Sequence, residues 1–456
     1  MKEVIRELEE IVGRDFVITK KEQMESYLFD ETSMPVRPKP SLSCIVVKPE
    51  NSEQISRILK LANQKRIPVY PRGGGTGLVG GAVPTKDGII VSLERMKHIE
   101  IDKDNLIAVA EAGVTLGELL KAVEESGLSF PPHPGDEGAQ VGGLVACNAG
   151  GARAVKHGVM RNFVKGIEVV LPTGEILNLG GKLLKDNMGY NLMHLIIGSE
   201  GTLGIITKAA IRLCPRAEYT LTLVLPFNSR HEALSAVPVI LTKGISPLAL
   251  EYVERELMEK SAAHLGEKWD IKGKVFLIAI LSGTQNEVYS EAEKIDQICS
   301  ERGSLEVYVA ERQDEQKAIL KIRSNIYTAL KEESGDIFDT TVPPSNIGKL
   351  ADEIDKIAEK YSAYIPVYGH AADGNLHAHV MKKDMDRYER IKSEIYEATV
   401  NLGGVITGEH GIGKIRVKEL YKFTPRKSIE LMKGIKRLFD PNNILNPGNV
   451  LNIEES

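Results

Sequence analysis

The glycine-rich run PRGGGTGLVGGAVP, from Pro71 to Pro84, constrains the fold of this chain more than any other feature of the sequence. Six of its fourteen residues are glycine. Glycine loses the most conformational entropy on folding and has no side chain to pack, so such a run marks backbone that approaches another group closely or takes positive φ repeatedly. Three kinds of segment fit: a flexible linker, a dinucleotide loop of the Rossmann type, and a phosphate cradle of another kind.

The flanking sequence favours the third kind of segment. Strands predicted before the run, at IPVYP, and after it, at GIIVSL, lie too close for a flexible linker. Gly75, Gly77 and Gly80 match the GxGxxG pattern, but that pattern needs a helix to open at its last glycine, which the next glycine and Pro84 prevent. A loop whose successive N–H groups point into one concavity binds phosphate without a helix, and Arg72 would add positive charge.

A second cluster of small residues occurs in HPGDEGAQVGGLVACNAGGARAVKHG, from His133 to Gly158. Gly142–Gly143 and Gly150–Gly151 lie on either side of Asn148. Either cluster alone could form tight turns between packed strands. Two clusters in one domain favour a site that grips a large, flat, phosphorylated ligand from two sides.

The chain has 456 residues, which predicts two or three domains, and its pattern changes after Pro215. Before that point short strands alternate with short helices, one capped at Asn51 or Ser52 and another opened by a capping box at Thr115. After it, long amphipathic helical stretches, such as residues 316–332, alternate with strands. This second pattern indicates an α+β domain.

Composition excludes several classes of protein. The net charge is −5 without a basic stripe, so we expect no nucleic-acid partner. The four cysteines are far apart and none forms a CxxC pair, which argues against an iron–sulfur cluster, a cysteine-rich zinc site and a disulfide framework. The N-terminus does not read as a signal peptide, and no uncharged apolar run approaches about 20 residues, so we expect no transmembrane segment and a cytoplasmic location.

The strongest chemical pattern lies in VYGHAADGNLHAHV and GVITGEHGIGK. His370, His377 and His379 fall on a predicted strand–turn–strand with its turn at Asp373–Gly374, and Glu409–His410 fall in another glycine-flanked turn. Two histidines and one carboxylate form a sound ligand set for a divalent metal with an open position. Because side chains alternate between the two faces of a strand, His377 and His379 lie on one face. The geometry of the turn then decides which of them lies beside His370. The alternative is three ordinary histidines near a surface turn.

The stretch GEHGIGKI, residues 408–415, also matches a P-loop up to its lysine. Ile415 occupies the position where Ser or Thr would bind Mg²⁺, and Glu409 would repel phosphate. We therefore expect no nucleoside triphosphate there.

These motifs together carry a family resemblance. The Arg72–Gly81 loop, VGGLVACNAGG and GSEGTLGIIT resemble the FAD-binding domain of vanillyl-alcohol-oxidase-type flavoproteins. The second half resembles the C-terminal domain of the FAD-linked D-2-hydroxy-acid dehydrogenases, which include D-lactate dehydrogenase, the glycolate oxidase catalytic subunit and D-2-hydroxyglutarate dehydrogenase. The resemblance covers nearly the whole chain in the same order.

The resemblance implies an α+β fold in three parts. The first is a vanillyl-alcohol-oxidase-type FAD-binding domain of two α/β subdomains over residues 1–216. The second is an α+β substrate (cap) domain with an antiparallel sheet over residues 217–400. The third, over residues 401–456, returns to the FAD domain and completes the active site.

The resemblance also implies the residues that bind FAD. No histidine occurs in the 71–84 loop, so we expect the attachment to be non-covalent. The expected cofactor-binding residues are Pro71, Arg72, Gly73, Gly74, Gly75, Thr76, Gly77, Gly80, Gly135, Gly142, Gly143, Asn148, Gly150, Gly151, Ile206 and Asn446.

For the second half, the resemblance assigns roles to the histidine motifs. His370, His377 and Glu409 match ligands of a divalent metal, which could be Zn, Fe or Mn, and His410 matches the catalytic base. Asn375 matches a substrate-contacting position, and Arg323 matches the arginine that holds the substrate carboxylate, although alone it would read as a helix-surface arginine.

Two residues depart from the family pattern. Ala372 replaces a glycine, which is a minor change. Ile337 stands where some relatives place a substrate-binding lysine, which weakens the case for a dicarboxylate and favours lactate or glycolate.

The predicted function is therefore an FAD-dependent dehydrogenase that oxidises a small D-2-hydroxy acid, D-lactate favoured, to the 2-keto acid. Metal-assisted proton abstraction would accompany hydride transfer to the flavin, and the electrons would pass to an electron-transferring flavoprotein or an iron–sulfur subunit. Glycolate or another D-2-hydroxy acid is the alternative substrate. A NAD-dependent Rossmann enzyme and a non-catalytic flavin-holding subunit of a larger redox complex are the alternatives of other classes.

Overall fold

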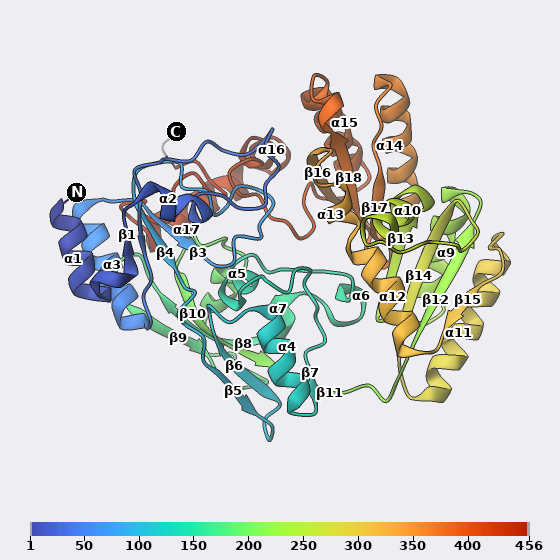
Figure 1. The fold of residues 1–456 in the computed structure, drawn as a ribbon, viewed down its shortest axis with the longest axis horizontal. Coiled ribbons are helices and arrows are strands. Elements are labelled where there is room, and N and C mark those ends of the chain that lie inside the picture. The colour runs from blue at the N-terminus through green and yellow to red at the C-terminus, as the bar shows by residue number, and fades with distance from the viewer. Residues whose placement is uncertain (1, 454–456) are drawn as a thin grey trace.

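The computed structural model describes residues 2–453, and its first half contains two main sheets (Figure 1). The first sheet has the order β1-β2-β4-β3, with β2 and β3 both parallel to β4. The second is antiparallel in the order β5-β6-β10-β8-β9. The strands of this half are β1 Val17–Ile18, β2 Ile45–Val47, β3 Val69–Arg72, β4 Ile89–Ser92, β5 Ile99–Asp102, β6 Ile107–Glu111, β7 Leu128–Ser129, β8 Val164–Val170, β9 Ile176–Gly180, β10 Ile205–Arg212 and β11 Cys214–Pro215.

Two helices of the first half begin where their caps predict. Asn51 accepts a hydrogen bond from Gln54 N at the start of α3, and Thr115 and Glu118 form the capping box of α4, so both expected N-termini are confirmed. No helix opens between β3 and β4, as a Rossmann loop would require. The helices are α1 Lys2–Val12, α2 Lys21–Met24, α3 Ser52–Lys65, α4 Leu116–Glu125, α5 Val141–Ala146, α6 Ala154–His157, α7 Met160–Phe163 and α8 Leu192–Ile196.

The second half is built on a seven-stranded sheet in the order β15-β12-β14-β13-β17-β18-β16, whose neighbours all pair antiparallel. Alternate side chains of β12 and β14 enter two separate cores, as the period of two in a strand requires. The strands are β12 Tyr219–Phe227, β13 Ala249–Glu254, β14 Val275–Gly283, β15 Tyr308–Ala310, β16 Ser334–Thr341, β17 Val367–His370 and β18 Asn375–Met381.

Helices cover both faces of this sheet. One core holds side chains of α9, α11, α14 and α15, and the other holds those of α10, α12 and α13. Their bounds are α9 Arg230–Thr242, α10 Arg255–His264, α11 Gln285–Ser300, α12 Gln313–Ser324, α13 Ile326–Leu330, α14 Ile347–Tyr361 and α15 Tyr388–Asn401. The helix expected over residues 316–332 is wrong as a single element, since it ends at Ser324 and restarts at Ile326. Asn325 lies at the break and donates to Ser261 O and Oγ.

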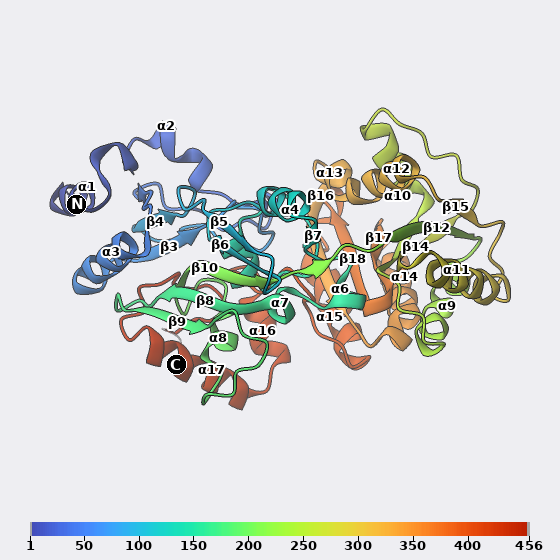
Figure 2. The same ribbon diagram turned by 90° about the horizontal axis from the view of Figure 1, so that it is seen from below.

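After α15 the chain returns to the first half. Helices α16 Val417–Phe423 and α17 Arg426–Phe439 follow, and Figure 2 shows α17 beside α8. Ile435 and Phe439 pack against the core that contains Ile196, while Leu445 pairs with Val69 and enters the core of the first sheet. No helix within residues 2–453 combines the length and apolarity of a bilayer span.

Candidate active site

Two histidines meet on the β17–β18 hairpin. Its turn covers Ala371–Asp373 and Gly374, close to the expected position, and the antiparallel register sets Tyr368 opposite His377. The His370 and His377 rings lie 5.3 Å apart, edge to face. His379 instead hydrogen-bonds Ser334 Oγ at 2.9 Å and Tyr368 OH at 3.3 Å. His377, not His379, is therefore the one that joins His370.

The turn that carries Glu409 and His410 is held by two buried carboxylates. Asp339 Oδ2 accepts hydrogen bonds from the backbone N–H groups of residues 408, 409 and 410, at 2.7–2.9 Å. Glu200, from the first half, accepts from Ile412 N and Gly413 N, both at 2.8 Å. Because these donors already have carboxylate partners, the turn has no free nest for a phosphate, which explains why the P-loop match is accidental.

The expected metal ligands converge. Glu409 Oε1 lies 3.4 Å from His370 Nε2 and 3.5 Å from His377 Nε2. Two ligand atoms bound about 2.1 Å from one tetrahedral cation are about 3.4 Å apart, so this spacing suits a shared divalent ion. The three side chains are at most 18% exposed, which shields the position between them from water.

A second grouping shares two of these residues. Asp339, His377, Glu409 and His410 each offer a ligand atom, and these atoms lie within 4.8 Å of one another. The carboxylate of Asp339 already accepts from the turn and from Asn375 Nδ2 at 2.7 Å, so it serves better as a support than as a ligand. The His410 ring stacks on His377 at 5.2 Å, which places it beside the metal position without replacing His370.

The surroundings of His370 and His377 shift the pKa values of the two rings in opposite directions. Burial alone would lower the pKa of His370, but Glu251 and Glu409 hold it well above its ordinary value. Burial and the neighbouring His410 and His370 hold the pKa of His377 well below its ordinary value, despite Asp339. The carboxylates around His370 thus attract positive charge. His377, in contrast, is the neutral imidazole that a metal ligand must be.

Arg323 reaches the same cluster of side chains from α12. It pairs with Glu251 on β13, and its guanidinium carbon lies 5.0 Å from the centre of the Tyr368 ring, which in turn contacts His377. Three buried polar atoms here have no hydrogen-bond partner among the described residues: Arg323 Nε, Asn375 Oδ1 and His377 Nδ1. Such atoms cost free energy unless a ligand or a water satisfies them, so a polar ligand bound here would recover that free energy.

The 71–84 loop has free donors. None of the N–H groups of Gly74, Gly75, Thr76 and Gly77 donates a hydrogen bond to another residue within 2–453. This contrasts with the 408–413 turn and fits a phosphate cradle. Arg72 is buried and donates to Ser26 O at 2.6 Å, and its Nη1 has no partner among the described residues.

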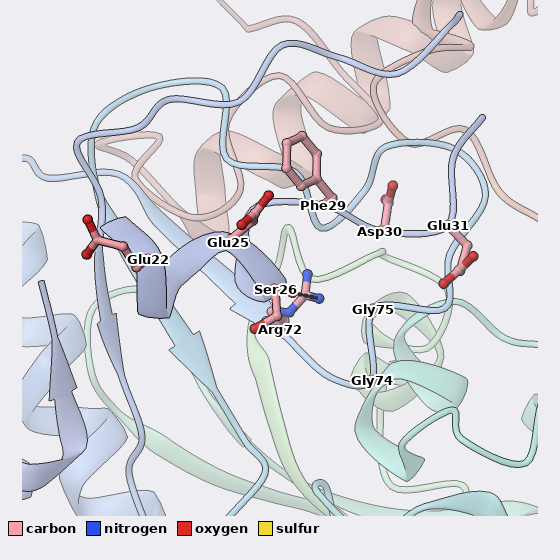
Figure 3. Close-up of a pocket in the computed structure, with 9 residues that line it drawn as sticks. All are labelled: Glu22, Glu25, Ser26, Phe29, Asp30, Glu31, Arg72, Gly74 and Gly75. Atoms are coloured by element: carbon pink, nitrogen blue, oxygen red, sulfur yellow. Dashed lines mark hydrogen bonds between the residues drawn. The ribbon is translucent and has the colours of Figure 1, made fainter. Parts of the chain in front are cut away.

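Figure 3 shows the hollow beside this loop, which has a volume of about 620 Å³. Arg72 shares the lining of this hollow with four acidic residues, which are Glu22, Glu25, Asp30 and Glu31. One guanidinium does not offset four carboxylates, so the hollow itself does not suit a pyrophosphate. The expected role of Arg72 and the loop toward FAD remains a prediction.

The second glycine cluster adjoins both the loop and Glu409, an expected metal ligand. A Cβ on Gly73 would lie 3.8 Å from Gly143 N, whereas a Cβ on Gly143 would meet nothing within 4 Å. A Cβ on Gly150 would lie 2.8 Å from Glu409 Oε2. The 139–151 segment therefore lies between the glycine-rich loop and Glu409, with open space beside Gly143 for a flat ligand.

Several other residues expected to bind the cofactor make hydrogen bonds or packing contacts within the fold. Asn148 takes φ 50° and accepts from Arg161 N, and Asn446 joins Gly81 O, Glu200 O and Lys414. Gly142 packs against Ala112. Contacts with FAD stay predictions for the remaining positions, which are Pro71, Gly80, Gly135, Gly151 and Ile206.

Sequence reasoning missed four residues that organise this site: Asp339, Glu251, Glu200 and Lys414. Asp339, Glu251 and Glu200 are acids in or beside apolar stretches, and that pattern is the available signal, because buried charges need partners. Lys414 donates to Gly81 O at 3.0 Å and Asn446 Oδ1 at 2.8 Å, and burial lowers its pKa to about 7. Their partners come from distant segments, which no local pattern reveals.

Comparisons with known proteins agree with this architecture. The family model described as "FAD linked oxidases, C-terminal domain" matches residues 216–450, and that of the FAD binding domain matches residues 44–180. A D-lactate dehydrogenase from Archaeoglobus fulgidus is 45% identical over 94% of this chain and 96% of its own length. The glycolate oxidase subunit GlcD of Bacillus subtilis is 38% identical over 90% of this chain and 89% of its own.

Solved structures show the same fold at lower identity. p-Cresol methylhydroxylase with substrate bound has a TM-score of 0.78 at 18% identity and covers 100% of this chain and 98% of its own. 4-Ethylphenol oxidase from Gulosibacter chungangensis has a TM-score of 0.76 at 19% identity, covering 98% of this chain and 96% of its own. The expected vanillyl-alcohol-oxidase-type α+β fold is confirmed. The chain is an oxidoreductase of the FAD-linked oxidases and belongs to the family of FAD-linked D-2-hydroxy-acid dehydrogenases.

Proposed function

We propose that this chain oxidises a small D-2-hydroxy acid, with D-lactate favoured, to the corresponding 2-keto acid. The observation that carries the proposal is that His370, His377 and Glu409 meet beside His410, and that Glu409 lies against Gly150 of the FAD-binding half. A hydroxy acid bound there would lie between a base, a cation position and the expected flavin.

Bound FAD would accept the hydride from C2, and a divalent metal held by His370, His377 and Glu409 would act as a Lewis acid toward the hydroxyl. Arg323 binds the substrate carboxylate, for which its unpartnered Nε offers a donor. His410 accepts the hydroxyl proton, and Asp339 holds its backbone N–H at 2.7 Å, which fixes the position of this base. The buried walls exclude water from the proton transfer.

The choice of a monocarboxylate rests on Ile337. It is 7% exposed and apolar, so it offers no charge to a second carboxylate. The D-lactate dehydrogenase of 45% identity favours D-lactate, and the GlcD relative of 38% identity keeps glycolate as the second candidate. The D configuration rests on the family.

We further propose that a separate redox protein, an electron-transferring flavoprotein or an iron–sulfur subunit, accepts the electrons in the cytoplasm. The four cysteines of this chain are dispersed, so the sequence supplies no iron–sulfur motif of its own. Reoxidation of the substrate-reduced chain by each class of acceptor, compared with reoxidation by a quinone and by oxygen, tests this route.

The direct test of the substrate is an anaerobic panel of 2-hydroxy acids, with both enantiomers, scored by flavin reduction in the isolated chain. We expect D-lactate to bleach the flavin faster than L-lactate and faster than D-2-hydroxyglutarate. If no 2-hydroxy acid reduces the flavin, the chain is a flavin-holding subunit and the proposed activity is wrong.

A further inference from the structure

Glu251 is a buried carboxylate that touches both the expected metal site and the expected substrate site. It lies on β13, directly opposite His370 in the β13–β17 register, and is 2% exposed. Its Oε1 lies 2.7 Å from His370 Nδ1, and its Oε2 pairs with Arg323. No other residue described above contacts both His370 and Arg323.

The contact with His370 has a consequence for metal binding. An ionised carboxylate only accepts hydrogen bonds, so His370 Nδ1 carries the hydrogen of this contact. In the neutral imidazole the lone pair is then on Nε2, the atom that lies 3.4 Å from Glu409 Oε1. A carboxylate behind a histidine in this way fixes the ring and strengthens it as a ligand.

The contact with Arg323 has a second consequence. Glu251 holds one terminal nitrogen of the guanidinium and leaves Nε without a partner among the described residues. One carboxylate therefore sets the positions of two groups that belong to different parts of the site.

We propose that Glu251 is a positioning residue that fixes His370 for the divalent metal and Arg323 for the substrate carboxylate. This inference rests on the proposed function, since both of its targets are members of that site. Glu251 itself touches neither the substrate nor the cation.

The test is a titration of the metal-stripped, FAD-bound full chain with Mn²⁺, followed by electron paramagnetic resonance. Glu251→Gln should raise the apparent Mn²⁺ dissociation constant roughly 10- to 100-fold, as loss of such a support does elsewhere. It should also raise KM for D-lactate more than its Mn²⁺-saturated kcat falls, because Arg323 loses its partner.

The matched control is Glu254→Gln. Glu254 is on the same strand, pairs with Arg230, and is away from the histidines. Its replacement should leave the Mn²⁺ dissociation constant within about twofold of that of the unmodified chain. The double variant Glu251→Gln/Arg323→Met removes both charges of the pair, and should recover thermal stability while Mn²⁺ binding stays weak.

The outcomes separate this inference from the proposed function. If the unmodified chain binds Mn²⁺ and turns over but Glu251→Gln behaves like Glu254→Gln, the inference is overturned and the proposed function stands. If the double variant regains full Mn²⁺ affinity, Glu251 acts only on the fold, which also overturns it. If the unmodified chain binds no divalent cation, the metal role is wrong in this inference and in the proposed function.

Discussion

At the scale of single residues, the site depends on buried carboxylates that no motif announces. The histidines and Glu409 could be predicted because glycine and acidic residues surround them at short spacing. Asp339 and Glu251 could not, because their partners His410 and His370 lie 71 and 119 positions away along the chain. A sequence predicts short-range chemistry, whereas the partners of a buried charge depend on the register of the sheet.

His410 is the proposed base, so its replacement should separate catalysis from binding. His410→Ala should lower kcat for D-lactate roughly 10²- to 10⁴-fold, the usual contribution of a general base, because no group would take the hydroxyl proton. The visible spectrum should still show bound FAD, and Mn²⁺ should still bind. His231→Ala, in the exposed part of α9, is the matched control and should keep its activity. Full activity in His410→Ala would show that His410 is not the general base.

Lys414 gives a pH dependence of stability. Its pKa is about 7 in the folded chain, below the value of about 10.4 for an unperturbed lysine. Between these pH values the unfolded chain binds a proton on Lys414 that the folded chain lacks. The contribution of Lys414 to the free energy of unfolding of the FAD-free chain therefore rises with pH from about 7 to about 10. Lys414→Met should remove that part of the slope.

Urea unfolding midpoints measured at pH 7, 8 and 9 check this expectation, with exposed Lys418→Met as the control. The Lys414→Met midpoints should rise less with pH than those of the unmodified chain. Parallel curves for the unmodified chain and Lys414→Met would contradict the assignment.

At the scale of elements, the two glycine-rich loops have similar compositions, but their backbone N–H groups have different partners. In the 408–413 turn, glycines allow close backbone contacts, and the N–H groups bind Asp339 and Glu200. In the 71–84 loop the N–H groups of residues 74–77 have no partner within 2–453. Strands, caps and the hairpin were predictable from local pattern, but only the folded contacts distinguish an internally satisfied loop from one that can bind a ligand.

Replacement of two glycines of the C-terminal segment by alanine should change the free energy of unfolding in opposite directions. Gly413 has φ 55°, and a Cβ there would lie 2.0 Å from Val79 O, so Gly413→Ala should cost at least about 1–2 kcal/mol. Gly434 lies inside α17 with nothing within 4 Å of an added Cβ, so Gly434→Ala should stabilise by about 1 kcal/mol. Denaturant unfolding measures both, and equal effects at the two positions would contradict the account of the turn.

At the scale of the whole molecule, the site exists only where the two halves meet. Glu200 holds the 412–413 backbone, Lys156 of α6 donates to Ser282 O at 2.9 Å in the second half, and Gly150 abuts Glu409. The order of the two halves along the chain was predictable from motifs. This contact was not, because its members come from segments more than 100 residues apart whose packing no local pattern encodes.

The central claim is that a flavin held by the first half faces a metal and a base supplied by the second. Its most direct test is anaerobic stopped-flow bleaching of the flavin by D-lactate before and after exhaustive metal removal, with Mn²⁺ restored as the control. We expect metal removal to abolish bleaching, to leave the flavin spectrum in place, and to be reversed by Mn²⁺. Bleaching at an undiminished rate in the metal-free chain would contradict the claim.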